Sequence, residues 1–385
     1  MVALVCALGA YSESYVLDQN AQSHTPVRSS NEHEAAVAYR YWNVAVKRLG
    51  LAIGQNSLEA VQCLCLTGIW YMNNMQPLQG WKHFALASNA WYTATIPRVA
   101  STTGGNEMSG DELLAIEQRL YFTCFKSEGE LAFELSLPRS ILESFEYQHT
   151  FPSPPPLDQQ PGVGERHEPE RRGWYYYLAE IACRHVTNRI TDVQRNRMPD
   201  PTTQGIEAMF EELEMFETQL NHWYDSLPTS VKFPLPVGDI RPLDDELSQL
   251  LRARYLGIRE MCYRPFVQLA VNYHLDLQPD LLTKVAAIVS QGLKYCLFRI
   301  QAVPPQWRHH GLWFQLPNST TCALVLIAAD RAQHDPALNT FRQIQLPSGW
   351  YLQILATRDL LARYWDNRRG GIWDCFRILD WALDS

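Results

Sequence analysis

The 385-residue chain lacks the cysteine spacing that a structural zinc site requires. Such a site needs four ligands, which usually come as C-x2-C pairs. The only two cysteines close together are Cys63 and Cys65, in a C-x-C arrangement. The nine cysteines are odd in number and stand among apolar residues, at positions 6, 63, 65, 124, 183, 262, 296, 322 and 375. We therefore expect free buried thiols in a reducing compartment, with no disulfide framework and no metal site.

An excess of positive charge is also missing. The chain has 33 basic and 41 acidic residues, a net charge of −8. A free-standing nucleic-acid binder usually has a basic excess, because phosphate contacts supply most of its affinity. Arg171 and Arg172 precede four aromatic residues, 174–177, which is the composition of a stacking patch, but the basic run is short and lies among glutamates. The charge balance predicts no direct DNA contact from this chain.

Long uncharged apolar runs are scarce. The longest uncharged run, residues 60–81, includes two asparagines, Pro77 and Gly80, so it does not read as a membrane span. The first ten residues have the apolar character of a signal-peptide core, but no positively charged segment accompanies them, since the first Lys or Arg is Arg28. We expect a buried first helix rather than a secretion signal.

Catalytic motifs are absent or incomplete. Neither the phosphate-binding G-x-x-x-x-G-K-[ST] nor the nucleophile motif G-x-S-x-G occurs. His33-Glu34 begins a zinc-protease H-E-x-x-H motif, but Val37 stands where the second histidine is needed. Asp244-Asp245-Glu246 is similar to the magnesium-binding acids of terpene cyclases, but Ser248 replaces a required acid. An acid-rich helix start explains the same three residues through the helix dipole.

Two further groups of polar residues have a structural alternative. His309 and His310 are adjacent, and neighbouring side chains on a helix point in different directions, so we expect local hydrogen bonds there. Glu128, Glu130 and Glu134 could serve acid–base chemistry, but no partner histidine or nucleophile is near them in sequence. We expect a solvated helix face at these glutamates. The sequence thus gives no catalytic residue, and we expect a protein that is not an enzyme.

Helical periodicity dominates the chain, and strand signals are few. The clearest helix is predicted over 205–227, where Pro228 stops it. Its apolar residues repeat at spacings of three and four, at Met209, Leu213, Phe216, Leu220, Trp223 and Leu227. This stripe favours a core-facing helix, with a coiled-coil contact as the alternative. Other helices are predicted over 111–131, 174–197, 244–270, 279–302, 318–334 and 349–366, the fifth capped by Asn318. These patterns predict an all-α fold.

Proline-rich segments divide the chain. Residues 149–173 hold six prolines and three glycines, and residues 225–244 form a second such connector. We expect an N-terminal helical part over 1–156, a connector over 157–173, and a C-terminal helical part over 174–385 packed on the first.

A series of segments, taken in order, resembles the fungal-specific transcription factor domain, the middle regulatory region of fungal zinc-cluster transcription factors. Residues 57–66, SLEAVQCLCL, are similar to its "SL..VQ.L.L" pattern, and residues 117–125, EQRLYFTCF, to "E.RRRLFW.C.". Residues 220–228 resemble "L..W...LP", residues 263–266 read YRPF, and residues 308–313 resemble "RHHG.W". Gln118 and Thr123 depart from the second pattern without changing its apolar spacing.

The resemblance implies a large all-helical regulatory domain that acts in the nucleus in control of RNA polymerase II transcription. In that family a separate zinc cluster reads DNA. The chain has no segment matching that cluster, so zinc is expected only in relatives and no cofactor is expected here. Implied partners are the transcriptional machinery or co-regulators and a small-molecule effector, with a homodimer as one arrangement and no membrane contact; the ligand-binding residues stay unknown.

Two arginines within the matching segments are open to two interpretations. Arg119 and Arg264 could cap helix ends or pair with buried carboxylates, or one of them could bind an anionic effector. Two alternatives to the regulatory function also stay open. One is an all-α enzyme of secondary metabolism, which requires converging acids or a metal. The other is an interaction scaffold that uses the stripe from Met209 to Leu227.

Overall fold

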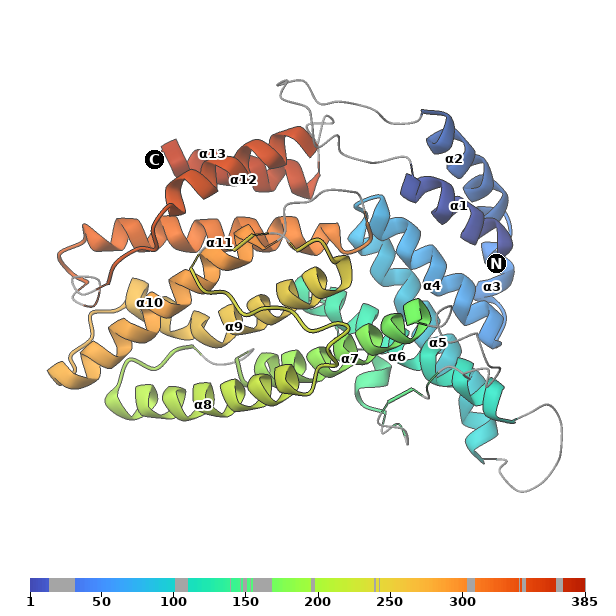
Figure 1. Cartoon of the computed structure of the whole chain (residues 1–385). Coiled ribbons are helices and arrows are strands. Elements are labelled where there is room, and N and C mark those ends of the chain that lie inside the picture. Colours follow the sequence, from blue (N-terminus) through green and yellow to red (C-terminus); the bar gives the residue numbers. More distant parts are fainter. Residues whose placement is uncertain are drawn as a thin grey trace. The chain divides into compact units, whose positions relative to one another are not determined.

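The computed structural model describes the chain except residues 14–31, 101–109, 139, 146, 148–150, 153, 155–167, 195–197, 239, 242, 303–308, 339, 341–343, 365–369 and 385. The described residues form α-helices α1 to α13 and one short 3-10 helix, η1, without a β-strand (Figure 1). The all-α prediction is therefore confirmed over this part of the chain. Residues 157–167 of the expected connector lie outside the described residues.

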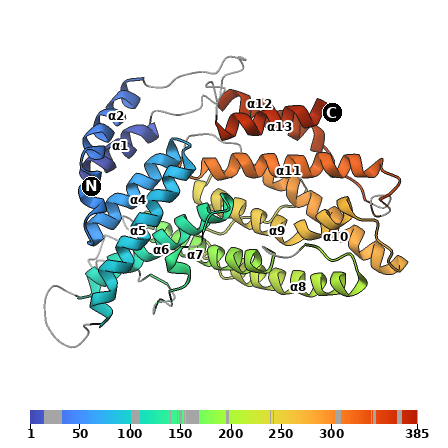
Figure 2. The ribbon, with the colours of Figure 1, turned by 180° about the vertical axis from the view of Figure 1, so that it is seen from behind.

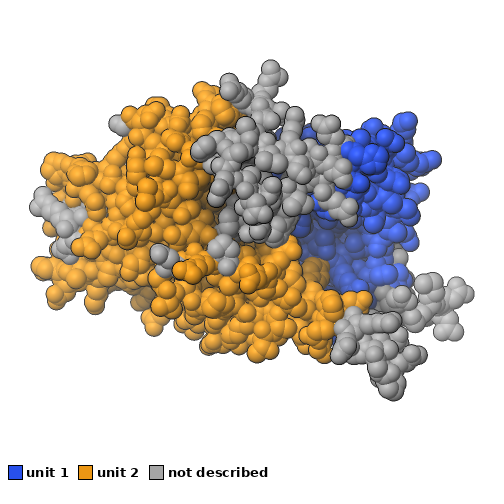
Figure 3. Space-filling model, turned by 45° about the horizontal axis from the view of Figure 1, so that its top comes forward, with its two compact units in different colours: residues 1–156, 305–313 blue, residues 157–304, 314–385 orange. Residues whose placement is uncertain are grey.

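The chain divides into two compact units (Figure 3). Unit 1 comprises Met1–Pro156 and Pro305–Trp313, and unit 2 comprises Leu157–Pro304 and Phe314–Ser385. Helix α7 starts at Glu168. The end of the expected connector is therefore helical, which its glycine and prolines did not suggest.

Unit 1 is built from α1 to α6 and η1, and its tightest packing is between α4 and α5. The helices are α1 (Val2–Glu13), α2 (Glu32–Val46), α3 (Leu49–Ile53), α4 (Leu58–Asn73), α5 (Pro77–Ala100), α6 (Gly110–Glu134) and η1 (Ile141–Glu143). The Ser57 side chain caps α4 by accepting the Ala60 amide hydrogen at 3.3 Å. Gly68 lets α5 approach, since a Cβ at this position would lie 2.7 Å from the Phe84 ring. As expected, the first helix is buried on one side, at Leu4, Ala7 and Tyr11.

Unit 2 is arranged around a long central helix. Its elements are α7 (Glu168–Gln194), α8 (Thr203–Asp225), α9 (Glu246–Asn272), α10 (Pro279–Gln301), α11 (Leu312–Gln333), α12 (Trp350–Tyr364) and α13 (Gly371–Asp384). Helix α9 packs against α7, α8 and α10, and two opposite views show α8 on one side of it and α10 on the other (Figures 1 and 2). Every member of the predicted α8 stripe, from Met209 to Leu227, is buried, so the core-facing prediction is confirmed.

Proline inside α9 is accommodated by a side chain from α7. Pro265 has no amide hydrogen, so the carbonyl group of Met261, four residues earlier, loses its helical donor. Gln194 Nε2 donates to that carbonyl oxygen at 3.0 Å. The YRPF segment can therefore stay helical because the tertiary contact replaces the missing bond.

The start of α11 differs from the prediction. Asn318 was expected to cap a helix over 318–334, but α11 begins at Leu312 and Asn318 lies within it. The proposed capping role of Asn318 is therefore wrong. The helix starts six residues earlier than predicted and includes Pro317 in its interior.

Two helices, α10 and α11, are long and apolar enough to cross a membrane by length and composition alone. Both bury apolar residues inside unit 2, among them Val289, Leu293 and Leu326. Helices in the core of a globular unit can have the same length and apolar composition, because they are apolar on most faces.

Candidate functional site: a buried charge and thiol cluster on α9

The most unusual chemistry of the described chain is concentrated on α9. This helix starts at a regular cap, since the Asp245 carboxylate accepts the Ser248 amide hydrogen at 2.8 Å. It then carries Arg252, Arg259 and Glu260 in buried positions, where charged residues are rare unless they are paired. Two polar networks follow from this, one on each side of the helix.

The first network surrounds Glu260, which is 1% exposed. Arg264, one turn later, donates from Nε to Oε1 at 2.8 Å and from a terminal nitrogen to Oε2 at 2.6 Å. Arg299 of α10 donates to the same Oε2 at 2.7 Å. Burial alone would raise the pKa of Glu260, but the two guanidinium groups outweigh it and hold that pKa below its ordinary value. Glu260 is therefore a carboxylate.

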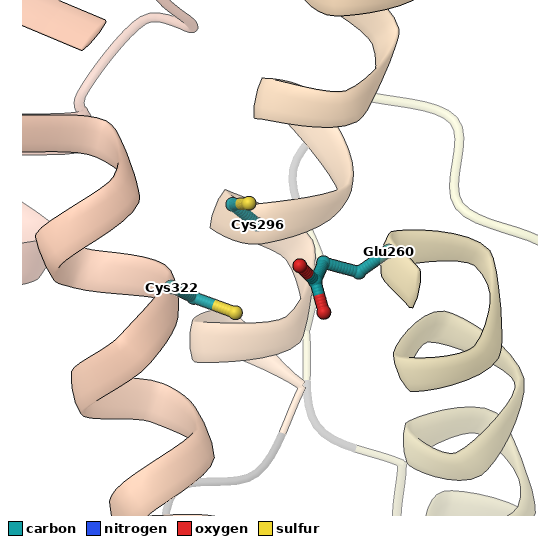
Figure 4. A group of neighbouring side chains, drawn as sticks. All are labelled: Glu260, Cys296 and Cys322. Atoms are coloured by element: carbon teal, nitrogen blue, oxygen red, sulfur yellow. The ribbon is translucent and has the colours of Figure 1, made fainter. Parts of the chain in front are cut away.

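Two thiols lie beside this carboxylate. Cys296 of α10 and Cys322 of α11 are both buried, and their sulfur atoms and a Glu260 oxygen lie within 4.8 Å of one another (Figure 4). A hydrogen bond with Cys322, followed by burial and the Glu260 charge, raises the pKa of Cys296 well above its ordinary value, although Arg264 opposes this. Cys296 is therefore a protonated thiol at neutral pH. Within the described ranges, no other group of three His, Cys, Asp or Glu side chains converges in this way.

The second network joins α9 to α8 through Arg259. Its guanidinium donates to Glu217 at 2.6 Å, to Asn221 at 2.5 Å and to the Tyr255 hydroxyl at 3.0 Å. Tyr263 also donates to Glu217, so this one carboxylate accepts from two residues of α9. Arg259 is thereby held by partners within the chain, and the network links the two helices.

The structure decides between the two interpretations of Arg264. This arginine of the YRPF segment is occupied by Glu260, which confirms pairing with a buried carboxylate. Arg119 lies half-buried on α6. The acids at 244–246 form the start of α9, and Asp245 also pairs with Arg172, so their helix-start interpretation is confirmed.

The remaining predicted residues stay apart from this cluster. Arg171 pairs with Glu168, and Arg172 also donates to the Ser230 carbonyl oxygen at 2.7 Å, so this basic pair is engaged inside the chain. His309 Nδ1 accepts the Gly311 amide hydrogen at 3.1 Å, which is the local bond expected there. His33 is exposed at the start of α2.

The solvated face expected at 128–134 is wrong for two of its three glutamates. Glu128 and Glu130 are 4% and 7% exposed, while Glu134 is half-buried. The Ser140 hydroxyl donates to Glu128, yet burial still raises the pKa of that carboxyl group above its ordinary value. Local spacing did not reveal this, because the residues that cover Glu128 come from η1 and from other helices of unit 1.

Unit 1 also holds a pair of thiols near Glu128. The sulfur atoms of Cys65, on α4, and Cys124, on α6, are 3.6 Å apart, and both residues are buried. The hydrogen bond with Cys65 and burial raise the pKa of Cys124. The prediction of free buried thiols is confirmed for these two and for Cys183, Cys262, Cys296 and Cys322.

The sequence reasoning missed Glu260, Cys296 and Cys322. One signal was available for the first, since Glu260 and Arg264 are four residues apart in an otherwise apolar stretch. The cysteines gave no signal, because they come from different helices and only the packing of α9, α10 and α11 brings them together.

Comparison of the chain with models of protein families, with curated proteins and with solved structures finds no match.

Proposed function

We propose that this chain is the regulatory domain of a fungal transcription factor, acting in the nucleus on RNA polymerase II transcription. The observation that carries the proposal is the ordered series of matching segments, four of which fall on α4, α6, α8 and α9. Their apolar positions, such as Leu58, Phe122 and Trp223, are buried. The series is thus consistent with packing requirements of one helical fold, which is what the resemblance implies.

The proposed mode of action is a shift between an inhibited and a permissive state. An effector or co-regulator can drive such a shift only through a difference in its affinity for the two states. A domain of two compact units provides elements that such a difference can act on. The α8 stripe is buried within unit 2, so a co-regulator would use another surface.

A tethering experiment tests this function. The whole chain is fused to a heterologous DNA-binding domain in a fungal host, and transcription of a reporter with matching operator sites is measured. We expect a reproducible rise or fall relative to the DNA-binding domain alone. The fusion with Glu260→Ala, which weakens the core of unit 2, serves as the matched control and should lose the effect. An unchanged reporter with the soluble, nuclear wild-type fusion would refute the proposal.

A DNA-binding experiment tests the proposal that a separate domain, and not this chain, binds DNA. The isolated chain is mixed with random duplex DNA at low salt, where phosphate contacts are strongest. With a net charge of −8 we expect no shift in electrophoretic mobility. Tight binding would contradict the view that this chain regulates without holding DNA.

A further inference from the structure

The Glu260, Cys296 and Cys322 cluster has the composition of a metal site. It offers two sulfur atoms and one carboxylate oxygen from three helices, α9, α10 and α11, all within unit 2 (Figure 4). Soft thiolate ligands together with one carboxylate favour Zn²⁺ over the hard cations Mg²⁺ and Ca²⁺, which prefer oxygen alone. The ligand set therefore selects a thiophilic divalent ion.

The distances among the two sulfur atoms and the Glu260 oxygen are close to those in a zinc site. With Zn–S of about 2.3 Å and Zn–O of about 2.1 Å, ligands of a tetrahedral site lie about 3.6–3.8 Å apart. The three ligand atoms lie within 4.8 Å of one another. Each pair of ligand atoms must therefore approach by at most about 1 Å to reach that geometry. The fourth position is then left to water.

The charge of the cluster also permits the ion. Two arginines and one glutamate give the buried group a net positive charge. A divalent ion bound by two thiolates displaces two thiol protons, so the charge of the cluster does not change on binding. The cost of bringing a cation near the guanidinium groups is offset by the two thiolates that form at the same time.

The arginines hold the carboxylate in place. Three hydrogen bonds from Arg264 and Arg299 orient Glu260, and two of them fall on Oε2. Oε1 accepts a single bond from Arg264 and keeps a lone pair for a metal. Carboxylates that bind metals are commonly oriented by outer partners in this way. The Arg264 side chain is 26% exposed, whereas that of Glu260 is 1% exposed.

We propose that Cys296, Cys322 and Glu260 bind one zinc ion per chain, in an open site with three protein ligands and a water in the fourth position. The proposal is independent of the transcriptional role, since it concerns the chemistry of the cluster alone. It differs from the expectation of no metal site, which considered only cysteines close together in sequence.

Zinc titration of the purified, chelator-treated chain tests the proposal. Zinc salt is added in competition with a chromophoric chelator, and Co²⁺ is used as a spectroscopic probe. We expect one equivalent of zinc per chain and, with cobalt, the intense visible bands of a tetrahedral site with sulfur-to-metal charge transfer. X-ray absorption of the zinc-loaded wild type should show two sulfur ligands at about 2.3 Å.

Paired variants identify the site. Cys296→Ser with Cys322→Ser should weaken zinc binding by at least about 100-fold, since loss of a direct ligand should cost at least as much as loss of an outer partner. Cys65→Ser with Cys124→Ser removes the same number of thiols from the other close pair, 3.6 Å apart, and should leave the affinity unchanged. Far-ultraviolet circular dichroism checks that both variants keep their helices.

The outcomes separate cleanly. Absence of stoichiometric zinc in the wild type, or zinc retained by the Cys296/Cys322 variant, overturns the proposal. Loss of zinc in the Cys65/Cys124 variant alone also overturns it. If the Cys296/Cys322 variant does not fold, the absorption spectrum of the wild type decides, because fewer than two sulfur ligands would contradict the assignment.

Discussion

Replacing Glu260 by alanine should destabilise unit 2 more than any surface change. Glu260 is 1% exposed and accepts hydrogen bonds from two arginines, at 2.6–2.8 Å. Its removal leaves Arg264 and Arg299 without their shared carboxylate. Breaking a buried ion pair by removing one partner costs about 3–5 kcal/mol, because an uncompensated charge stays behind. We expect the free energy of unfolding to fall by about that amount.

Urea denaturation followed by circular dichroism measures the effect, with Glu214→Ala as the control. Glu214 is exposed on α8, and its replacement should change stability by less than about 0.5 kcal/mol. Arg299→Ala alone should cost less than Glu260→Ala, because Arg264 keeps both of its bonds to Glu260. If Glu260→Ala were as mild as the Glu214 control, the ion pairs would not be formed in solution as the structure shows them.

The difference in stability between the wild type and Glu260→Ala should depend on pH in a defined direction. The folded-state pKa of Glu260 lies below its ordinary value of 4.5, because the two arginines outweigh the burial that acts to raise it. The stabilisation from Glu260 is therefore fully present above pH 4.5 and is lost as the pH falls toward the folded-state pKa. The gap between wild type and Glu260→Ala should narrow in acid, and a constant gap from pH 7 down to acid unfolding would refute the assignment.

Three further predictions concern unit 1. Burial raises the pKa of Glu128 above 4.5, so the wild type should lose stability as the pH rises from 4.5 through the folded-state pKa. The Glu128→Gln variant should not show this loss, and urea denaturation midpoints at several pH values measure the difference. Gly68→Ala should lower the melting temperature, because the added Cβ would meet the Phe84 ring. Gly9→Ala has open space around it and should raise the free energy of unfolding by about 0.5–1 kcal/mol. Equal effects of the two variants on the melting temperature would contradict the α4–α5 contact. Ser57→Ala should cost about 1 kcal/mol by removing the cap of α4, and Ser57→Asp should restore it in the same melting assay.

The helices themselves follow from local sequence. The spacing of apolar residues from Met209 to Leu227, with a proline directly after them, was enough to place α8 and its buried face. Acids at 244–246 likewise marked the start of α9. These features are local because helix periodicity and capping involve residues only three or four positions apart.

Errors appeared where tertiary contacts override local rules. A solvated face was predicted at Glu128 and Glu130, because no partner histidine or nucleophile is near them in sequence, but both side chains are buried. Asn318 was predicted to cap a helix, yet α11 begins at Leu312 and Asn318 lies inside it. Pro265 lies deep inside α9, and Gln194 of another helix supplies the hydrogen bond that makes this acceptable.

The amino-acid sequence by itself determined that this chain is helical, where most of its helices lie and which stripes face the core. Only the tertiary structure decided which distant side chains meet: Glu260 with Arg299, Cys296 with Cys322, and Cys65 with Cys124. The reason is physical, since helix formation depends on neighbours within one or two turns. A buried cluster instead depends on how separate helices pack, and no local pattern encodes which residues that packing brings together.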